Sequence, residues 1–266
     1  MSTDNKRFLI IPDNENIADS IALAEKYNMG FEYNDFFMPD VLDDDAECMV
    51  LTYDYKKFRL PDYCTLHGAF FDVIVCSVDK RIRKISDFRV KQSIAAAEKI
   101  GAKAVIFHTN YNPFLNSPKY VEDWIMQNTE YWGNILQKYP DMNIYLENMF
   151  DTSPEIIARL AENLSVNSNF GVCLDYAHAS LTSVPVRTWW EMLSPYVRHM
   201  HINDNDLISD LHLAAGDGLI NWDEFYNLYE LFADDPTILI ETSSLENQKK
   251  TIDKFVSDGF IHDPRI

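Results

Sequence analysis

Short, nearly continuous apolar runs alternate with longer amphipathic segments along the chain. Eight runs have the length of β-strands and lie at 7–12, 30–35, 64–70, 103–110, 143–150, 170–180, 197–204 and 237–244. Segments with apolar residues at helical spacing lie at 16–29, 86–101, 120–139, 154–164, 184–196, 221–232 and 245–256. Strands buried on both faces of a parallel sheet read as continuous apolar runs, so this alternation predicts a parallel sheet covered by helices.

Eight strands, all but the second followed by a helical segment, in a chain of 266 residues predict an α/β fold, a single (β/α)8 TIM barrel that spans residues 1–266 as one domain. A doubly wound parallel sheet is the alternative architecture. The chain contains neither of the glycine-rich phosphate-binding patterns, GxGxxG or GxxxxGK[ST], that would favour a nucleotide-binding variant of that alternative. We therefore expect the barrel.

Local signals set the expected ends of some helices. Ser86 is a candidate N-cap for the helix predicted at 86–101, and Gly101 is placed to end it. Pro154 lies in the expected first turn of the helix predicted at 154–164.

Acidic residues and histidines stand where six consecutive strands end. These residues are His67, His108, Glu147, Asp175, His201 and Glu241. Three more of the same types follow in the loops after the sixth and seventh strands, namely His178, Asp210 and His212. A single strand-end His or Asp is more often a hydrogen-bonded residue or a helix cap. As a set, however, these side chains would converge on the barrel mouth, and buried carboxylates are costly unless they are paired or bind metal.

His199 precedes His201 by two residues, so the two side chains share one face of the seventh strand. His199 is expected one layer deeper in the barrel. It is either a core residue or a partner that supports a metal ligand from behind.

The charge balance argues against nucleic acid and anionic membranes as partners. The chain carries 42 acidic and 23 basic residues, a formal net charge of −19, and its one dense basic cluster is at 79–84. No run approaches 18 apolar residues, and the first residues lack the apolar stretch of a signal peptide, so a cytoplasmic location is expected. The four cysteines are widely spaced and are expected to be unpaired.

The chain resembles the xylose-isomerase-like TIM-barrel superfamily. The stretches that carry the resemblance are LHGAF, AAAEKIGAKAVIFHTNYNP, YLEN, CLDYAHA, HINDND, DLHLAAGDGLINW and LIET. Sugar epimerases of this group hold one divalent ion with residues that match Glu147, Asp175, His201 and Glu241. The resemblance implies that the two glutamates move a proton between neighbouring sugar carbons through an enediolate.

Relatives of the endonuclease IV type, which cleave apurinic sites in DNA, hold three zinc ions. Their additional ligands match His67, His108, His178, Asp210 and His212. Two departures count against that activity here: the last pair lies in DLHLAAGDG rather than a stretch with Arg between Asp and His, and Glu147 is followed by NMFDTSPE rather than a glycine-rich segment. The net charge also removes a general affinity for DNA.

The sequence therefore predicts a metal-dependent isomerase or epimerase that acts on a sugar or sugar phosphate. The alternative is a zinc-dependent phosphoesterase or apurinic-site endonuclease, and a barrel that only binds a ligand is a third reading. Glu147 and Glu241 are the candidate catalytic residues, and Phe70, Tyr111 and Asn203 are candidates for contact with the substrate. The cofactor is expected to be zinc, or manganese or magnesium if one ion is held. A homo-oligomer is compatible with the sequence.

Overall fold

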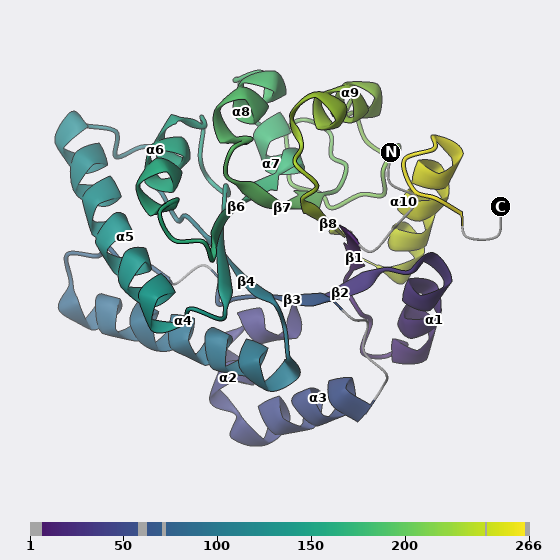
Figure 1. The fold of residues 1–266 in the computed structure, drawn as a ribbon, viewed down its shortest axis with the longest axis horizontal. Helices are drawn as coiled ribbons and strands as arrows, with labels where there is room; N and C mark the ends of the chain where they lie inside the picture. Colours follow the sequence, from purple (N-terminus) through teal and green to yellow (C-terminus); the bar gives the residue numbers. More distant parts are fainter. Residues whose placement is uncertain (1–6, 58–62, 71–72, 243, 264–266) are drawn as a thin grey trace.

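Eight parallel strands close into a ring in the computed structural model, in the order β1 to β8 (Figure 1). Residues 7–57, 63–70, 73–242 and 244–263 are described. The strands are β1 (Phe8–Ile10), β2 (Gly30–Tyr33), β3 (Cys64–His67), β4 (Ala104–His108), β5 (Asn143–Glu147), β6 (Phe170–Asp175), β7 (Val197–Ile202) and β8 (Thr237–Ile240). The pairing of β1 with β8, in which Leu9 lies opposite Leu239, closes the ring. The predicted (β/α)8 TIM barrel is confirmed.

Helices surround the ring of strands, as Figure 1 shows. They are α1 (Ile17–Tyr27), α2 (Pro39–Asp43), α3 (Asp45–Lys57), α4 (Lys80–Ile100), α5 (Pro118–Lys138), α6 (Glu155–Leu164), α7 (Tyr176–Ser180), α8 (Val186–Leu193), α9 (Trp222–Phe232) and α10 (Leu245–Ser257). In the described part of the chain, no helix is long and apolar enough to cross a membrane.

The start of α4 differs from its prediction. The helix begins at Lys80, because the side chain of Asp79 caps it by accepting a hydrogen bond from the backbone N–H of Arg81 (2.7 Å). Ser86 lies buried inside the helix, where its hydroxyl accepts from the backbone N–H of Ile74 (2.9 Å). Ser86 is therefore a tertiary contact of α4 rather than its N-cap.

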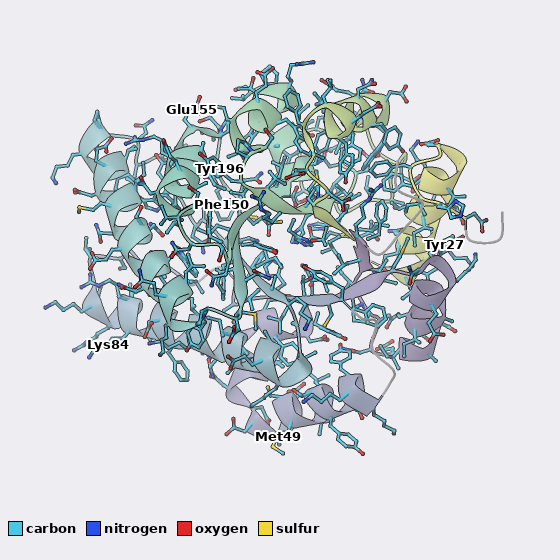
Figure 2. All side chains as sticks on the ribbon, in the orientation of Figure 1. Tyr27, Met49, Lys84, Phe150, Glu155 and Tyr196 are labelled. Carbon is cyan, nitrogen blue, oxygen red and sulfur yellow. The ribbon has the colours of Figure 1, made fainter. Side chains whose placement is uncertain are left out.

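The barrel wall and the inner faces of the helices form the apolar core. Trp124 and Trp132 on α5 and Trp189 and Trp190 on α8 are almost completely buried. Figure 2 shows side chains filling both the ring and the space between the strands and the helices, whereas Lys84 lies at the outer edge of the molecule on α4. The basic cluster at 79–84 therefore lies at the start of α4, on the outside of the barrel.

Candidate metal centre

A cavity of about 560 Å³ opens among the metal-binding residue types at the strand ends. In a TIM barrel, the loops at the carboxyl ends of the strands build the active site. The polar residues that line it include His67, His108, Glu147, His178, Asp210, His212 and Glu241. Its apolar residues are Ile11, Phe37, Phe70, Met149 and Leu211. The cavity is therefore lined by His, Asp and Glu side chains, which can bind metal, and by large apolar side chains.

The side chains of Glu147, Asp175, His201 and Glu241 form a compact group, the four-ligand group. One atom from each lies within 4.8 Å of the others, and all four residues are buried. His201 Nδ1 lies 3.3 Å from Glu147 Oε1 and 3.4 Å from Glu241 Oε2. Atoms about 2 Å from one ion are roughly 3.3 Å apart in a tetrahedral site, so these separations suit a shared ion.

Asp175 divides its two oxygens between two roles. Oδ1 accepts a hydrogen bond from the backbone N–H of His178 (2.6 Å) and so caps α7. Oδ2 is buried without a hydrogen-bond partner among the described residues. The amide of Asn148 holds the Asp175 backbone at both its N–H and its C=O (2.9 and 3.0 Å). Helix capping therefore leaves one oxygen of Asp175 free to bind a cation.

Glu147 also belongs to a second group with His67 and His108, the His67 group. Its Oε2 atom lies 3.6 Å from His67 Nε2 and 3.4 Å from His108 Nε2. Because Oε1 faces His201 and Oε2 faces the other two histidines, the one carboxylate can bridge two cations.

His178, Asp210 and His212 form a third group, the His178 group. Asp210 Oδ2 lies 3.2 Å from His178 Nε2 and 3.1 Å from His212 Nε2. His212 has a left-handed backbone conformation (φ +49°), which costs a non-glycine residue about 1–3 kcal/mol. This strained backbone conformation occurs in the loop conformation that places the His212 side chain beside Asp210.

Hydrogen bonds to backbone carbonyls fix which ring nitrogens carry a hydrogen. The Nδ1 atoms of His67, His178 and His212 lie 3.0, 2.9 and 3.1 Å from carbonyl oxygens of residues 68, 148 and 241. A carbonyl only accepts, so each Nδ1 donates and each Nε2 of a neutral ring carries a lone pair. These lone pairs face carboxylate oxygens, an arrangement that requires a proton or a metal ion between them.

The electrostatics of the site reflect the same requirement. Burial lowers the pKa of His201, but the carboxylates around it, including Glu147 and Glu241, outweigh burial and raise it well above its usual range. Burial also raises the pKa of Glu147, but the charges of His201 and His108 bring it well below its usual range. Burial, together with Glu147 and Glu241, raises the pKa of Asp175 to about 7. The site therefore stabilises positive charge at its centre.

The residues present fit a divalent metal. Four buried atoms of the four-ligand group lack a hydrogen-bond partner in the described structure: Glu147 Oε2, Asp175 Oδ2, His201 Nδ1 and Glu241 Oε2. Unpartnered buried polar atoms are costly and call for a ligand. Imidazoles with carboxylates suit zinc, and a carboxylate-rich set also suits manganese.

Asp204 fixes the loop between β7 and α9, which carries Asp210 and His212. Its carboxylate accepts four hydrogen bonds, from the backbone N–H groups of residues 205, 216 and 220 and from Trp222 Nε1 (2.7–3.0 Å). A Cβ atom on Gly218 would lie only 2.3 Å from the carbonyl oxygen of Asn205. The GDGLINW stretch is thus the part of the loop wrapped around one buried carboxylate.

The candidate substrate residues occupy different surroundings. Phe70 lines the cavity with its ring 4.5 Å from that of His108, centroid to centroid. Tyr111 is buried against Tyr120 and Trp124, outside the set of residues that line the cavity. Asn203 is fully buried after β7, and its amide has no partner in the described structure. Substrate contact by these residues stays a prediction.

Sequence reasoning did not single out Glu32 on β2. Its side chain is completely buried and contacts both His199 and His201. The signal for it is a carboxylate inside an otherwise apolar strand, GFEY. Burial raises the pKa of Glu32, but the charges of His201 and His199 and their hydrogen bonds bring it below its usual range.

Comparison with known proteins agrees with this barrel. The family profile described as "Xylose isomerase-like TIM barrel" matches residues 22–255. The chain belongs to this family. Protein MJ1311 of Methanocaldococcus jannaschii is 26% identical over 70% of this chain and 66% of its own length. Fructoselysine 3-epimerase of Shigella flexneri is 23% identical over 53% of this chain, and the match spans about half of that enzyme (52%).

Solved structures of similar barrels superpose over nearly the whole chain. A D-tagatose 3-epimerase-like protein is 21% identical, with a TM-score of 0.76 over 97% of this chain and 98% of its own. The TTHB071 protein of Thermus thermophilus, which was soaked with zinc chloride, is also 21% identical. Its TM-score is 0.75 over 94% of this chain and 96% of its own. At these identities, the superpositions establish the fold alone.

Proposed function

We propose that this member of the xylose isomerase-like family is a metal-dependent isomerase or epimerase that acts on a sugar or sugar phosphate. The observation that carries the proposal is the four-ligand group, in which Glu147 and Glu241 stand with Asp175 and His201 around one point. The match to fructoselysine 3-epimerase, over about half of that enzyme, supports the same class.

Proton transfer is the task assigned to the two glutamates. Hydrogen bonding and charge from His201 help to lower the pKa of both Glu147 and Glu241, although burial opposes the shift, so both are ionised at neutral pH. An ionised carboxylate can take a proton from a carbon next to a carbonyl, and a second one can serve the opposite face of that carbon. A bound divalent ion would polarise the carbonyl and stabilise negative charge on its oxygen.

The apolar residues beside the four-ligand group provide a surface on which a sugar ring can pack. The ring of Phe37 lies 5.6 Å from that of Phe70, centroid to centroid, and both line the cavity. The less polar face of a sugar ring can pack on such side chains, and apolar walls exclude the water that would compete for the proton. The polar groups then orient its hydroxyls.

Charge distinguishes an unphosphorylated sugar from a phosphate ester. The three groups contain four carboxylates (Glu147, Asp175, Asp210 and Glu241), or −4 in formal charge with neutral histidines. One divalent ion would leave −2, and three would give +2. No Lys or Arg is among the described residues that line the cavity. A one-ion site therefore favours a sugar without a phosphate group.

A zinc phosphoesterase is the second candidate, and the His178 group is the observation that favours it. Two imidazoles that converge on Asp210 Oδ2 provide a place for an additional cation beyond the four-ligand group. Two or three ions close together can stabilise the attacking and leaving oxygens of a phosphodiester.

Metal content and activity together test the proposal. We would measure the metal bound by protein purified without added metal, and then follow deuterium incorporation from heavy water into a panel of ketoses and ketose phosphates. Exchange at one carbon next to the carbonyl, dependent on a divalent ion, is the expected result. Cleavage of phosphodiesters or an abasic duplex by a three-zinc form, without any exchange into sugars, would replace it with the second candidate.

A further inference from the structure

A second polar layer lies beneath the four-ligand group, inside the barrel. It consists of Glu32 on β2, Thr65 on β3, His199 on β7 and Thr237 on β8, which we call the floor network. Glu32, Thr65 and His199 have no exposed surface. A carboxylate at such depth is costly unless it is fully supplied with donors.

Hydrogen bonds tie one oxygen of Glu32 to this network. Glu32 Oε2 accepts from the hydroxyl of Thr65 (2.6 Å) and from His199 Nε2 (3.0 Å). Since a carboxylate only accepts, His199 carries its hydrogen on Nε2. His199 Nδ1 then accepts from the hydroxyl of Thr237 at 2.6 Å. Both nitrogens of His199 are therefore engaged within the barrel.

The other oxygen of Glu32 faces the candidate metal centre. His201 Nε2 lies 3.1 Å from Glu32 Oε1, although the contact lacks the angle of an ideal hydrogen bond. The opposite nitrogen, Nδ1, faces Glu147 and Glu241 in the four-ligand group. The ring of His201 thus spans the two layers, with one nitrogen in each.

We propose that Glu32 is a positioning residue that keeps the hydrogen of His201 on Nε2 and presents the Nδ1 lone pair to a divalent ion. A histidine ligand commonly donates its second N–H to a carboxylate, which fixes the tautomer and the ring orientation and makes the ligand a better donor. Thr65 and His199 hold Glu32 in turn, and Thr237 holds His199. This inference rests on the metal dependence of the proposed function but not on its substrate.

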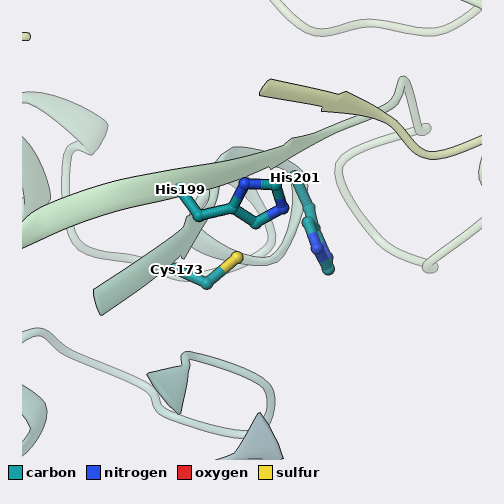
Figure 3. A group of neighbouring side chains, drawn as sticks. All are labelled: Cys173, His199 and His201. Carbon is teal, nitrogen blue, oxygen red and sulfur yellow. The ribbon is translucent and has the colours of Figure 1, made fainter. Parts of the chain in front are cut away.

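A competing interpretation assigns a separate metal to Cys173, His199 and His201. Figure 3 shows the sulfur of Cys173 directed toward the two imidazole rings, and one donor atom of each residue lies within 4.8 Å of the others. A metal there would have to displace Thr237 or Glu32 from His199, because each nitrogen of that ring already has a hydrogen-bond partner. The hydrogen bonds favour the positioning role.

The direct test is the variant Glu32→Gln, which preserves the size of the side chain and removes its charge. We would determine the Kd for zinc of the folded protein by competition with a chelator, and record the visible spectrum of the cobalt-substituted protein. We expect binding about 10- to 100-fold weaker and a changed cobalt spectrum. An unchanged Kd would overturn the proposal.

Thr52→Val is the matched control for a general loss of stability. It removes a buried hydroxyl that donates to the carbonyl oxygen of Cys48 within α3, outside the floor network and the metal-binding groups. We expect a lower melting temperature, with zinc affinity close to that of the wild-type protein. If Thr52→Val weakens zinc binding as much as Glu32→Gln, the effect is one of general packing, and the positioning role is wrong.

The tautomer can be measured with Glu32 in place, so the proposal does not depend on the folding of Glu32→Gln. Nitrogen NMR of the zinc-loaded chain should show His201, identified by its loss in His201→Gln, with its hydrogen on Nε2 and zinc on Nδ1. A hydrogen on Nδ1 would contradict the proposal.

Cys173→Ala tests the competing metal site. We expect it to leave the number of bound ions unchanged, and loss of one ion would favour the separate site instead. All these measurements use no substrate. A failure of sugar exchange with the expected affinity loss would thus refute the proposed reaction while leaving the role of Glu32 intact.

Discussion

The four-ligand group and the floor network beneath it both contain buried carboxylates and histidines, yet they differ in how donors meet acceptors. In the floor network, each contact to Glu32 Oε2 is a donor facing an acceptor, at 2.6 and 3.0 Å. In the four-ligand group, oxygens and a ring nitrogen converge without hydrogens between them, and several have no partner in the described structure. Residue type and burial alone do not identify a metal site. What identifies it is that buried acceptor atoms face one another with no hydrogen-bond donor between them.

The largest effect should come from removing the carboxylate of Glu147, which belongs to both the four-ligand group and the His67 group. Glu147→Gln replaces an oxygen with an NH2 group, which cannot bridge two cations and cannot take a proton. We expect the rate of exchange into the sugar to fall by at least about 100-fold, and the bound metal to decrease at both the four-ligand group and the His67 group.

Kinetics and elemental analysis of purified protein would check this result. The control is Glu130→Gln, which changes an exposed glutamate on α5. If Glu147→Gln retains wild-type activity, the unpaired acceptors of the four-ligand group do not mark a catalytic site.

An intermediate effect is expected at the edge of the site. Asp210→Asn should remove the cation affinity of the His178 group, because Asp210 is the one carboxylate that its two histidines share. We expect proton exchange to stay within a few-fold of wild type, because the four-ligand group remains complete. A zinc phosphoesterase would instead lose its activity with the ion. Metal titration and exchange rates, compared with the surface variant Asp141→Asn, would distinguish the two functions.

The smallest effect concerns the metal-free protein and pH. Burial lowers the pKa of His212, but hydrogen bonding to Asp210 and the charge of Glu241 outweigh it and raise the value to about 9. The folded-state pKa is therefore above the unfolded value of about 6.5, so this stabilisation is fully present below pH 6.5 and is lost as the pH rises through 9.

Urea unfolding of the metal-free protein at several pH values would measure this loss. After allowing for solvent screening at this partly exposed ring, we expect a decrease of about 1 kcal/mol in unfolding free energy between pH 6.5 and 9. His212→Asn should show a smaller decrease from this source. An equal decrease in both proteins would show that His212 does not act as the proton carrier of the His178 group.

The sequence predicted the barrel and the convergence of nine side chains, six at strand ends and three in the following loops, because the fold converts chain order into position. Most of the buried parallel strands are nearly continuous apolar runs, and the carboxyl ends of all the strands meet at one mouth. A residue such as Glu241 is therefore placed by the run ILI that precedes it, without knowledge of any contact.

Other features could not be read from that pattern. The helices α2 and α3 were not indicated, because α3 is rich in polar residues and lacks a clear apolar stripe. The partners of Glu32 lie 33 and 167 residues away along the chain, at Thr65 and His199, so only closure of the ring reveals them. The left-handed conformation of His212 depends likewise on contacts distant in sequence.

The packing of Gly218 against Asp204 also bears on how this protein can change. The close approach anchors the stem of the β7–α9 loop, whereas Leu207, Ile208 and Leu211 on its outer part are exposed. Substitutions at that rim can alter which molecules the mouth admits while the anchored stem keeps its shape. Directed evolution of this loop should therefore vary Leu207 and Ile208, and keep Asp204, Gly218 and the stretch 210–212, which carries two of the candidate metal ligands.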